Sequence, residues 1–167
     1  DDIKRILRQV MKAVCAKSEL RMAFLQELSY HMGENRERGD IPKMSGFSSM
    51  KNRRLEISEN GFCLDGEPFY LASGDMHYFR THPSGWKRRL MKDFGLTAVE
   101  TYVAWNRHEP KKGVFDFSGE NDLAAFLQLC QNIGLKVLLR PAPYVCGEID
   151  FGGLPAWLLK DRTMVVR

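Results

Sequence analysis

The first part of the chain carries apolar residues at helical spacing. Ile3, Leu7, Val10 and Val14 recur at three- and four-residue steps among basic side chains, which predicts an amphipathic helix. A second apolar group within residues 20–28 predicts another helix by the same criterion.

Residues 1–48 are therefore interpreted as a helical extension followed by a polar linker with charged residues, Gly and Pro. Three interpretations of this part remain open: a partner-binding helical hairpin, an extension that packs on its own domain, and an artefact of gene prediction. Most aromatic residues, including all three tryptophans, follow it. The core-forming residues are therefore concentrated in the C-terminal two thirds.

From residue 55 the pattern changes to short apolar runs separated by turn residues. Residues 55–58 and 62–64 flank Asn60-Gly61, which predicts a β-hairpin. Strands then alternate with helical segments, and each crossover is long enough to hold a helix, so we expect a parallel α/β arrangement. The elements expected are a strand at 69–74, a helix starting at Pro83 with Gly95 as its C-cap, a strand at 97–103, a helix introduced by residues 117–119 and ended by Gly134, and a strand at 135–140. The apolar faces of the two helices comprise Trp86, Leu90, Met91 and Phe94 in the first and Leu123, Phe126, Leu127 and Cys130 in the second.

Length and composition narrow the function classes. A chain of 167 residues, 44% hydrophobic and 28% charged, suits one globular domain. No run approaches the length of a membrane span, and a net charge of +4 is too mild to favour a nucleic-acid partner. The four cysteines lack the CxxC spacing of a zinc knuckle, and no GxGxxG follows the first parallel strand, so neither a metal nor a dinucleotide cofactor is expected. No signal peptide is visible, although a chain that starts at Asp1 can have lost one.

The expected ends of the parallel strands carry polar and aromatic residues. The segments are DMHYFR at 75–80, YVAWNRHEP at 102–110 and PAPYVCGEID at 141–150. In parallel α/β folds the functional groups gather where strands end. Aromatic rings can cover the apolar face of a sugar, and a carboxylate such as Glu148 can accept two of its hydroxyl protons.

Structural interpretations stand beside this functional one. His77 is also typical of a hydrogen-bonded core histidine, Arg140 of a buried structural ion pair, and Trp157 of packing. His108-Glu109 lacks the HExxH pattern, so metal binding is not supported there.

Several long segments resemble glycoside hydrolase family 35, the β-galactosidases, in the same order along the chain. SGDMHYFR at 73–80 is similar to SGSIHYxR, and TYVAWNRHEP at 101–110 is similar to TYVPWNxHEP. FDFSG at 115–119 matches the same five residues in the family, and LRPAPYVCGEIDFGGLPAWLL at 139–159 is similar to LRPGPYICAEWxxGGLPxWLL. The resemblance covers about residues 51–167, and the motif sequences are most similar to those of animal members. The departures are Ala104 for proline, Ala142 for glycine, Gly147 for alanine and Asp75-Met76 for Ser-Ile.

The resemblance implies a (β/α)8 TIM barrel and retaining hydrolysis of terminal β-D-galactose, with a β-galactoside as substrate. Residues 49–167 would form about three βα units of that barrel, preceded by the helical extension. By motif match, Tyr102 would hold the sugar, the backbone of Cys146 and Gly147 would line its pocket, and Glu148 would bind its hydroxyls. It also implies a lysosomal or secreted protein, and it leaves the oligomeric state open.

No residue of this chain is expected to be catalytic. The family's two glutamates follow strands four and seven, the first in a segment like QVENEYG, and no such segment occurs here. The isolated chain is therefore expected to be inactive and prone to aggregation, because three units leave an uncovered sheet edge. The alternatives are a galactose-binding pseudoenzyme, a non-catalytic fragment, an interaction protein that uses its N-terminal helices, and a different sugar-cleaving barrel.

Overall fold

The computed structural model describes residues 5, 8–10, 55–90, 94–141 and 143–163. The chain divides into two compact units, residues 18–70 and residues 1–17 together with 71–167. Of the expected helical extension, Arg5 and residues 8–10 are helical. The second expected helix and the linker lie outside the described residues.

The described part of the first unit is a small antiparallel sheet. Strands β1 (Leu55–Ser58), β2 (Gly61–Leu64) and β3 (Glu67–Pro68) are ordered β1-β2-β3. Asp65 and Gly66 both have positive φ, 58° and 85°, as a tight hairpin turn requires. The predicted hairpin is confirmed, because β1 pairs antiparallel with β2. The third strand, β3, was not anticipated.

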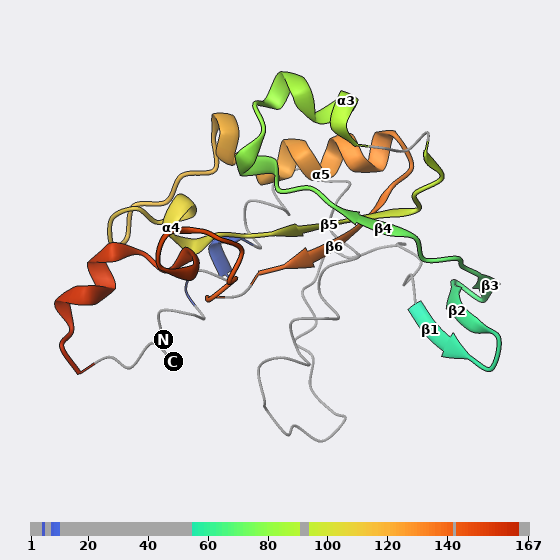
Figure 1. Cartoon of the computed structure of the whole chain (residues 1–167), viewed down its shortest axis with the longest axis horizontal. Helices are drawn as coiled ribbons and strands as arrows, with labels where there is room; N and C mark the ends of the chain where they lie inside the picture. The colour runs from blue at the N-terminus through green and yellow to red at the C-terminus, as the bar shows by residue number, and fades with distance from the viewer. Residues whose placement is uncertain (1–4, 6–7, 11–54, 91–93, 142, 164–167) are drawn as a thin grey trace, which may run out of the picture. The chain divides into compact units, whose positions relative to one another are not determined.

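The second unit contains a parallel sheet. Strands β4 (Ser73–Asp75), β5 (Ala98–Tyr102) and β6 (Lys136–Arg140) are ordered β4-β5-β6, and both pairs are parallel. This confirms the predicted strand–crossover–strand order and establishes a mixed α/β fold (Figure 1).

The first parallel strand begins later than predicted. The sequence predicts a strand over 69–74, whereas β4 covers Ser73–Asp75. Ladder pairing starts at Ser73 opposite Ala98. One residue earlier, the amide of Ala72 donates to the hydroxyl of Thr97 at 2.9 Å, not to a strand carbonyl. Apolar composition alone does not reveal where a partner strand ends.

Short helices fill the crossovers. The first crossover contains η1 (Tyr78–Arg80), η2 (Pro83–Gly85) and α3 (Trp86–Arg89); the second contains α4 (Trp105–His108), η4 (Gly119–Asn121) and α5 (Leu123–Asn132); η5 (Asp150–Gly153) and η6 (Ala156–Lys160) follow β6. The single helix predicted from Pro83 is a 3₁₀ turn followed by α3, and residues 91–93 of that prediction lie outside the described part. Phe94, predicted on its apolar face, is 82% exposed.

Helix α5 ends where predicted, just before Gly134, but it begins at Leu123, after the separate 3₁₀ turn η4. The side chain of Asp122 accepts a hydrogen bond from the amide of Ala125 at 2.8 Å and caps the first turn, as short polar residues do at helix starts. Gly134 follows the helix with φ of 77°, the left-handed conformation typical of a C-terminal glycine. The predicted apolar face of Leu123, Phe126, Leu127 and Cys130 is buried.

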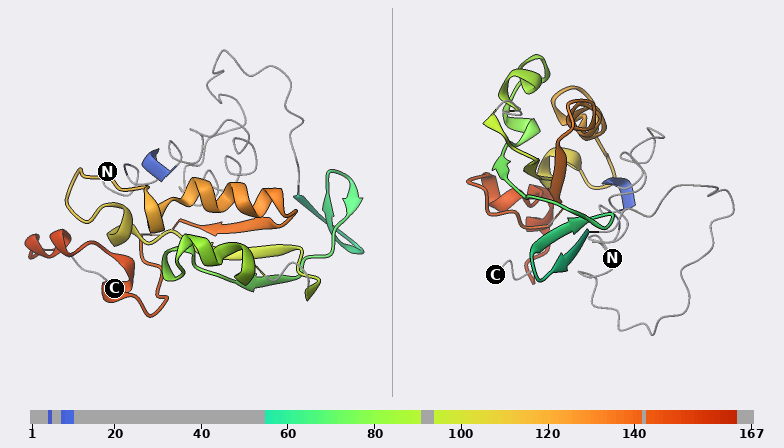
Figure 2. Two further views of the ribbon diagram at one scale, coloured as in Figure 1. Left: turned by 90° about the horizontal axis from the view of Figure 1, so that it is seen from above. Right: turned by 90° about the vertical axis from the view of Figure 1, so that its right-hand side faces the viewer.

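The parallel sheet has one apolar face and one polar face. Helices α3 and α5 lie on the same side of it (Figures 1 and 2). Alternate residues of a strand point to opposite faces, and Val99, Thr101 and Leu139 are buried. These residues therefore form the face beneath the helices, which leaves Glu100, Tyr102 and Arg140 on the other face.

Candidate functional site

The structure brings two of the predicted site residues into contact. Tyr102 is the last residue of β5, and Gly147 lies in the loop after β6. A Cβ atom added to Gly147 would lie 2.9 Å from Cε2 of the Tyr102 ring, closer than such contacts occur in proteins. The loop backbone therefore packs directly on the ring, and the exposed side chains of Cys146 and Glu148 flank the contact.

The loop after β6 has an unusual backbone. Cys146 and Glu148 have φ of 50° and 45°, a left-handed conformation that non-glycine residues seldom adopt. Nη2 of Arg80 donates to the carbonyl of Gly147 and, at 3.1 Å, to the carbonyl of Glu148. Such strained residues persist where surrounding contacts hold them. Arg80, from η1, is one of these contacts, and the motif match did not assign it a role.

Replacing Arg80 by Met should loosen this loop. A hydrogen bond from a charged donor contributes about 1.5–3 kcal/mol, and Arg80 makes two to neighbouring carbonyls. We therefore expect amide hydrogen exchange in residues 143–149 of the complete protein to accelerate about tenfold or more. The exposed Arg88 of α3 is the matched control for Arg80, and Arg88→Met should leave that exchange unchanged. Equal exchange in both variants would show that other contacts hold the loop.

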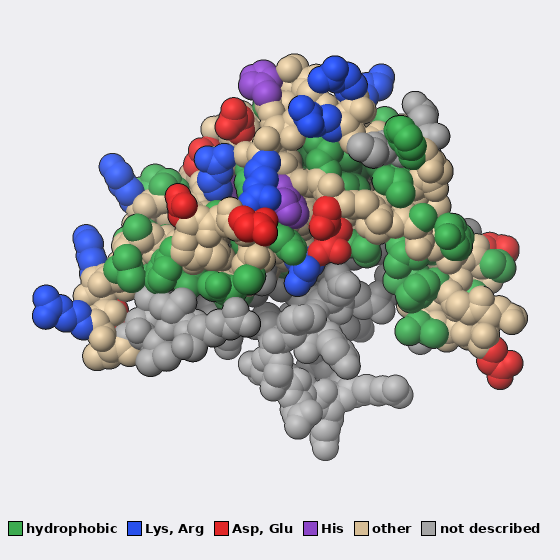
Figure 3. Space-filling model, in the orientation of Figure 1, with side chains coloured by type: hydrophobic (Ala, Val, Ile, Leu, Met, Phe, Trp, Pro, Cys, Tyr) green, Lys and Arg blue, Asp and Glu red, His purple; other side chains and the backbone are tan. Residues whose placement is uncertain are grey.

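Tyr102 lies in a row of aromatic and charged groups on the polar face of the sheet. The His77 ring stacks on it with centroids 4.5 Å apart. Nη1 of Arg140 donates to the Tyr102 hydroxyl at 3.1 Å and to Oε1 of Glu100 at 2.9 Å. The hydrogen bond to Glu100 raises the pKa of Arg140 above its usual value. In the space-filling view, acidic, basic and histidine side chains lie side by side over the parallel strands (Figure 3).

Two structural interpretations of these residues are wrong. Nδ1 of His77 is buried but finds no hydrogen-bond partner among the described residues, so His77 is not a fully hydrogen-bonded core histidine. Burial, and next the charge of Arg80, lower the pKa of His77. Arg140 does form an ion pair, but its side chain is 59% exposed and not buried. Both residues belong to the row that contains Tyr102, with His77 half-buried and Arg140 exposed.

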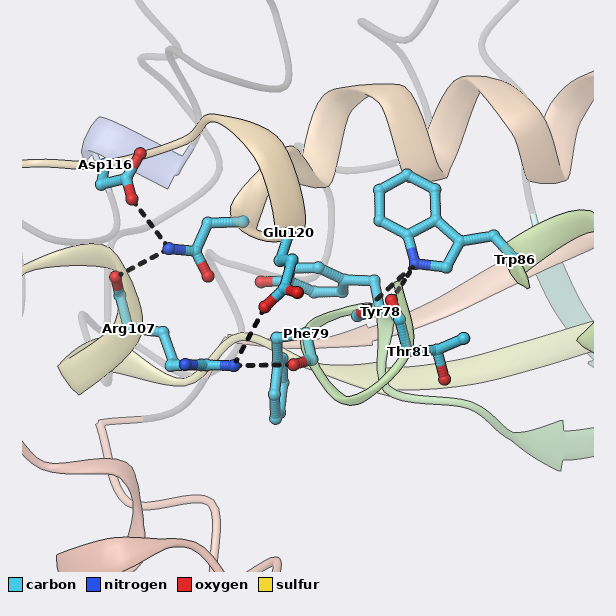
Figure 4. A network of polar contacts seen from close by, with 8 residues as sticks. Tyr78, Phe79, Thr81, Trp86, Arg107, Asp116 and Glu120 are labelled. Atoms are coloured by element: carbon cyan, nitrogen blue, oxygen red, sulfur yellow. Dashed lines mark hydrogen bonds and ion pairs between the residues drawn. The ribbon is translucent and has the colours of Figure 1, made fainter. Parts of the chain in front are cut away.

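A second layer of polar contacts joins the loops that follow β4 and β5 (Figure 4). Arg107 donates to the carbonyl of Phe79 at 2.7 Å and lies 3.9 Å from a carboxylate oxygen of Glu120. Nδ2 of Asn121 donates to the carbonyl of Arg107 and to Oδ2 of Asp116. These contacts hold the segment that carries His77 and Arg80 against the segment that follows Tyr102.

His108 and Glu109 are buried beside these loops, and their side chains stabilise the structure rather than face a ligand. The Tyr78 hydroxyl donates to Nε2 of His108, whose Nδ1 donates to the carbonyl of Asp116 at 2.8 Å. Burial lowers the pKa of His108 to about 4, so the ring is neutral at pH 7. Within the described ranges, no three His, Cys, Asp or Glu residues form a group that could hold a metal ion.

Trp157 has a packing role, as one interpretation of the sequence predicts. Its Nε1 donates to the carbonyl of Glu109 at 2.9 Å. Its ring meets the ring of Trp105 edge to face, with centroids 5.7 Å apart.

The arrangement is suited to binding a polyhydroxylated ligand. It combines an aromatic ring, carboxylates, a guanidinium group and loop carbonyls at the carboxyl ends of parallel strands, where α/β folds bind ligands. Side-chain carboxylates accept hydroxyl protons and guanidinium groups donate to hydroxyl oxygens. No helix in the described part of the chain is long and apolar enough to cross a membrane.

Comparisons with known proteins agree with this chemistry. The family model of glycosyl hydrolases family 35 matches residues 61–167. The chain is 48% identical to a beta-galactosidase of Felis catus over 122 residues, which are 72% of this chain and 18% of the relative. It is also 48% identical to the human beta-galactosidase-1-like protein 2 over 71% of this chain and 19% of that protein.

A plant relative, beta-galactosidase 17 of Arabidopsis thaliana, is 46% identical over 66% of this chain and 16% of its own length. The chain thus spans less than a fifth of the length of these relatives. The family match covers most of the chain, including both parallel crossovers and the loop that packs on Tyr102. The chain therefore belongs to family 35 of the glycosyl hydrolases.

Proposed function

We propose that the protein containing this chain is a β-galactosidase that hydrolyses terminal, non-reducing β-D-galactose residues with retention of configuration. The observation that carries the proposal is the contact of the Tyr102 ring with the loop of Gly147 at the carboxyl end of a parallel sheet, in a chain of family 35. The relatives named beta-galactosidase support the same reaction.

The architecture that fits this function is a (β/α)8 barrel. The parallel order β4-β5-β6 with helices on one face is what three successive barrel units would have,. In this proposal residues 49–167 supply those units and residues 1–48 form the extension. The polar face with Tyr102 would then point into the barrel, near the end where barrel enzymes bind substrate.

Each predicted site residue has a role in this proposal. The Tyr102 side chain holds the sugar, the backbone of Cys146 and Gly147 lines its pocket, and the Glu148 carboxylate accepts hydrogen bonds from its hydroxyls. Retaining hydrolysis needs two carboxylates about 5–5.5 Å apart, and we assign neither of them to a residue of this chain. In this proposal the reaction needs no cofactor, and the partner is a β-galactoside rather than nucleic acid. The proposed location of the protein is the lysosome or the secreted space.

Hydrolysis of an aryl β-galactoside by the complete protein tests the proposal. The first-formed sugar, followed by NMR, should be β-galactose. We expect Glu148→Gln to lower kcat/KM roughly 10- to 100-fold, since hydrogen bonds to a charged group contribute about 1.5–3 kcal/mol. Glu59→Gln, in the exposed turn of the β1–β2 hairpin, is the matched control and should leave kcat/KM unchanged. Galactose binding without turnover would favour a pseudoenzyme, and absence of both would refute the proposal.

A further inference from the structure

The neighbours of the Tyr102 hydroxyl determine whether it donates or accepts a hydrogen bond. Tyr102 and Arg140 are register partners on the neighbouring strands β5 and β6. Glu100 precedes Tyr102 by two residues. Because the side-chain period of a strand is two, all three side chains share the polar face of the sheet.

The contacts on this face allow only one direction of hydrogen bonding. A guanidinium group has donors and no acceptor. Arg140 Nη1, 3.1 Å from the Tyr102 oxygen, must therefore donate to it, and the phenol oxygen accepts. Tyr102 makes no hydrogen bond in which its own O–H donates to another described residue. Its single proton therefore remains available for a ligand.

Both groups are held in place. The Arg140 guanidinium also donates to Oε1 of Glu100 at 2.9 Å, which keeps it beside the phenol. The Tyr102 ring is stacked on His77 at 4.5 Å, and its edge meets the backbone of Gly147. The ring therefore has little freedom to turn its hydroxyl away from Arg140.

We propose that Arg140, anchored by Glu100, is a positioning residue that makes the Tyr102 hydroxyl a hydrogen-bond donor toward one oxygen of the sugar. This inference rests on the proposed function, and it adds a selection rule to it. The subsite selects for a sugar position that carries an acceptor. Fluorine accepts weakly and does not donate, so it should partly replace the hydroxyl at that position, whereas hydrogen should not.

Competitive inhibition of the complete protein by mono-deoxy- and mono-fluoro-galactoses tests this rule without involving the chemical step. In the wild type we expect one sugar position at which the fluoro analogue binds about three- to tenfold more tightly than the deoxy analogue. Arg140→Met leaves the Tyr102 hydroxyl able to donate but no longer holds its proton toward the sugar, so the ratio of the two inhibition constants should fall toward one. Tyr102→Phe should also bring the ratio to one, and Arg140→Lys should restore part of it. The exposed Arg88→Met is the matched control and should keep the wild-type ratio.

Each outcome decides the inference. A wild-type ratio near one at every position, or a ratio that Arg140→Met leaves unchanged, overturns it while galactose binding itself stands. If Arg140→Met does not fold, Glu100→Gln keeps the size of the side chain but weakens the anchor. The ratio should then fall part of the way, and an unchanged ratio overturns the inference. If the wild type neither binds galactose nor hydrolyses galactosides, the proposed function fails, and this inference fails with it.

Discussion

Replacing Glu109 by alanine should destabilise the α/β unit by about 3–5 kcal/mol, the cost of breaking a buried ion pair by removing one partner. The Glu109 carboxylate is fully buried and lies 2.5 Å from Nη1 of Arg5. It also accepts hydrogen bonds from Nε1 of Trp105 and from the amide of Gly113, both at 2.7 Å. Its loss removes the acceptor of one buried indole N–H and the carboxylate that pairs with Arg5, so thermal unfolding of the complete protein should begin at a clearly lower temperature.

Two further variants separate the parts of this effect. Glu109→Gln keeps one acceptor oxygen and the volume of the side chain, so it should cost less than alanine. Arg5→Met removes the cation, which also lies over the rings of Phe115 and Trp157 at 5.5 and 5.8 Å. It should destabilise the unit, whereas the exposed Arg8→Met should not. An Arg5→Met variant as stable as the wild type would show that the pairing of Arg5 with Glu109 adds nothing to the stability of this unit.

Acid should destabilise the same unit through His108. The pKa of the ring is about 4 in the folded protein, because of burial, and 6.5 as its ordinary value. Below 6.5 the unfolded chain binds a proton that the folded chain does not. The stabilisation present above pH 6.5 is therefore lost as the pH falls toward 4, by about 3 kcal/mol for a shift of this size. Unfolding free energies measured across this range should show the loss.

His108→Gln removes the titrating group and should flatten this pH dependence, at the cost of a lower stability at pH 7. His82→Gln, at an exposed position, should leave the slope unchanged.

His77, whose pKa is also lowered, contributes in the same direction. Hydrogen bonds from Ser118 and Asn121 lower the pKa of Asp116 from its ordinary value of 3.8, so Asp116 adds to the loss of stability only at the acidic end of this range. An unchanged slope in His108→Gln would contradict the assignment. In an acidic compartment such as the proposed lysosome, part of this stabilisation would be absent.

The interpretation of Gly147 shows the limit of a motif comparison. The family pattern has alanine at this position, and the sequence alone shows only that the chain departs from it. The structure shows that a Cβ there would meet the Tyr102 ring at 2.9 Å. Glycine therefore lets the loop approach the ring more closely than alanine would, by a few tenths of an ångström.

Sequence patterns also could not predict which residues the charged side chains contact. Arg80 and Gly147 are 67 residues apart, and Arg140 and Tyr102 are 38 apart. Periodicity reports which face of its own element a residue occupies, but not which distant side chain it meets. The interpretations of Arg140 as buried and of His77 as fully hydrogen-bonded were wrong for this reason.

The family, the alternation of strands with helical crossovers, the apolar face of α5, and the clustering of polar residues after each parallel strand could all be predicted from the amino-acid sequence. These properties depend on local periodicity and on contiguous motifs. Other features became visible only in the folded chain: where β4 begins, that Arg5 pairs with the buried Glu109, that Arg80 holds the loop of Gly147, and that Arg140 donates to Tyr102. Each of these depends on a contact between residues far apart along the chain, and its energy comes from burial and hydrogen-bond geometry that exist only once the segments are folded together.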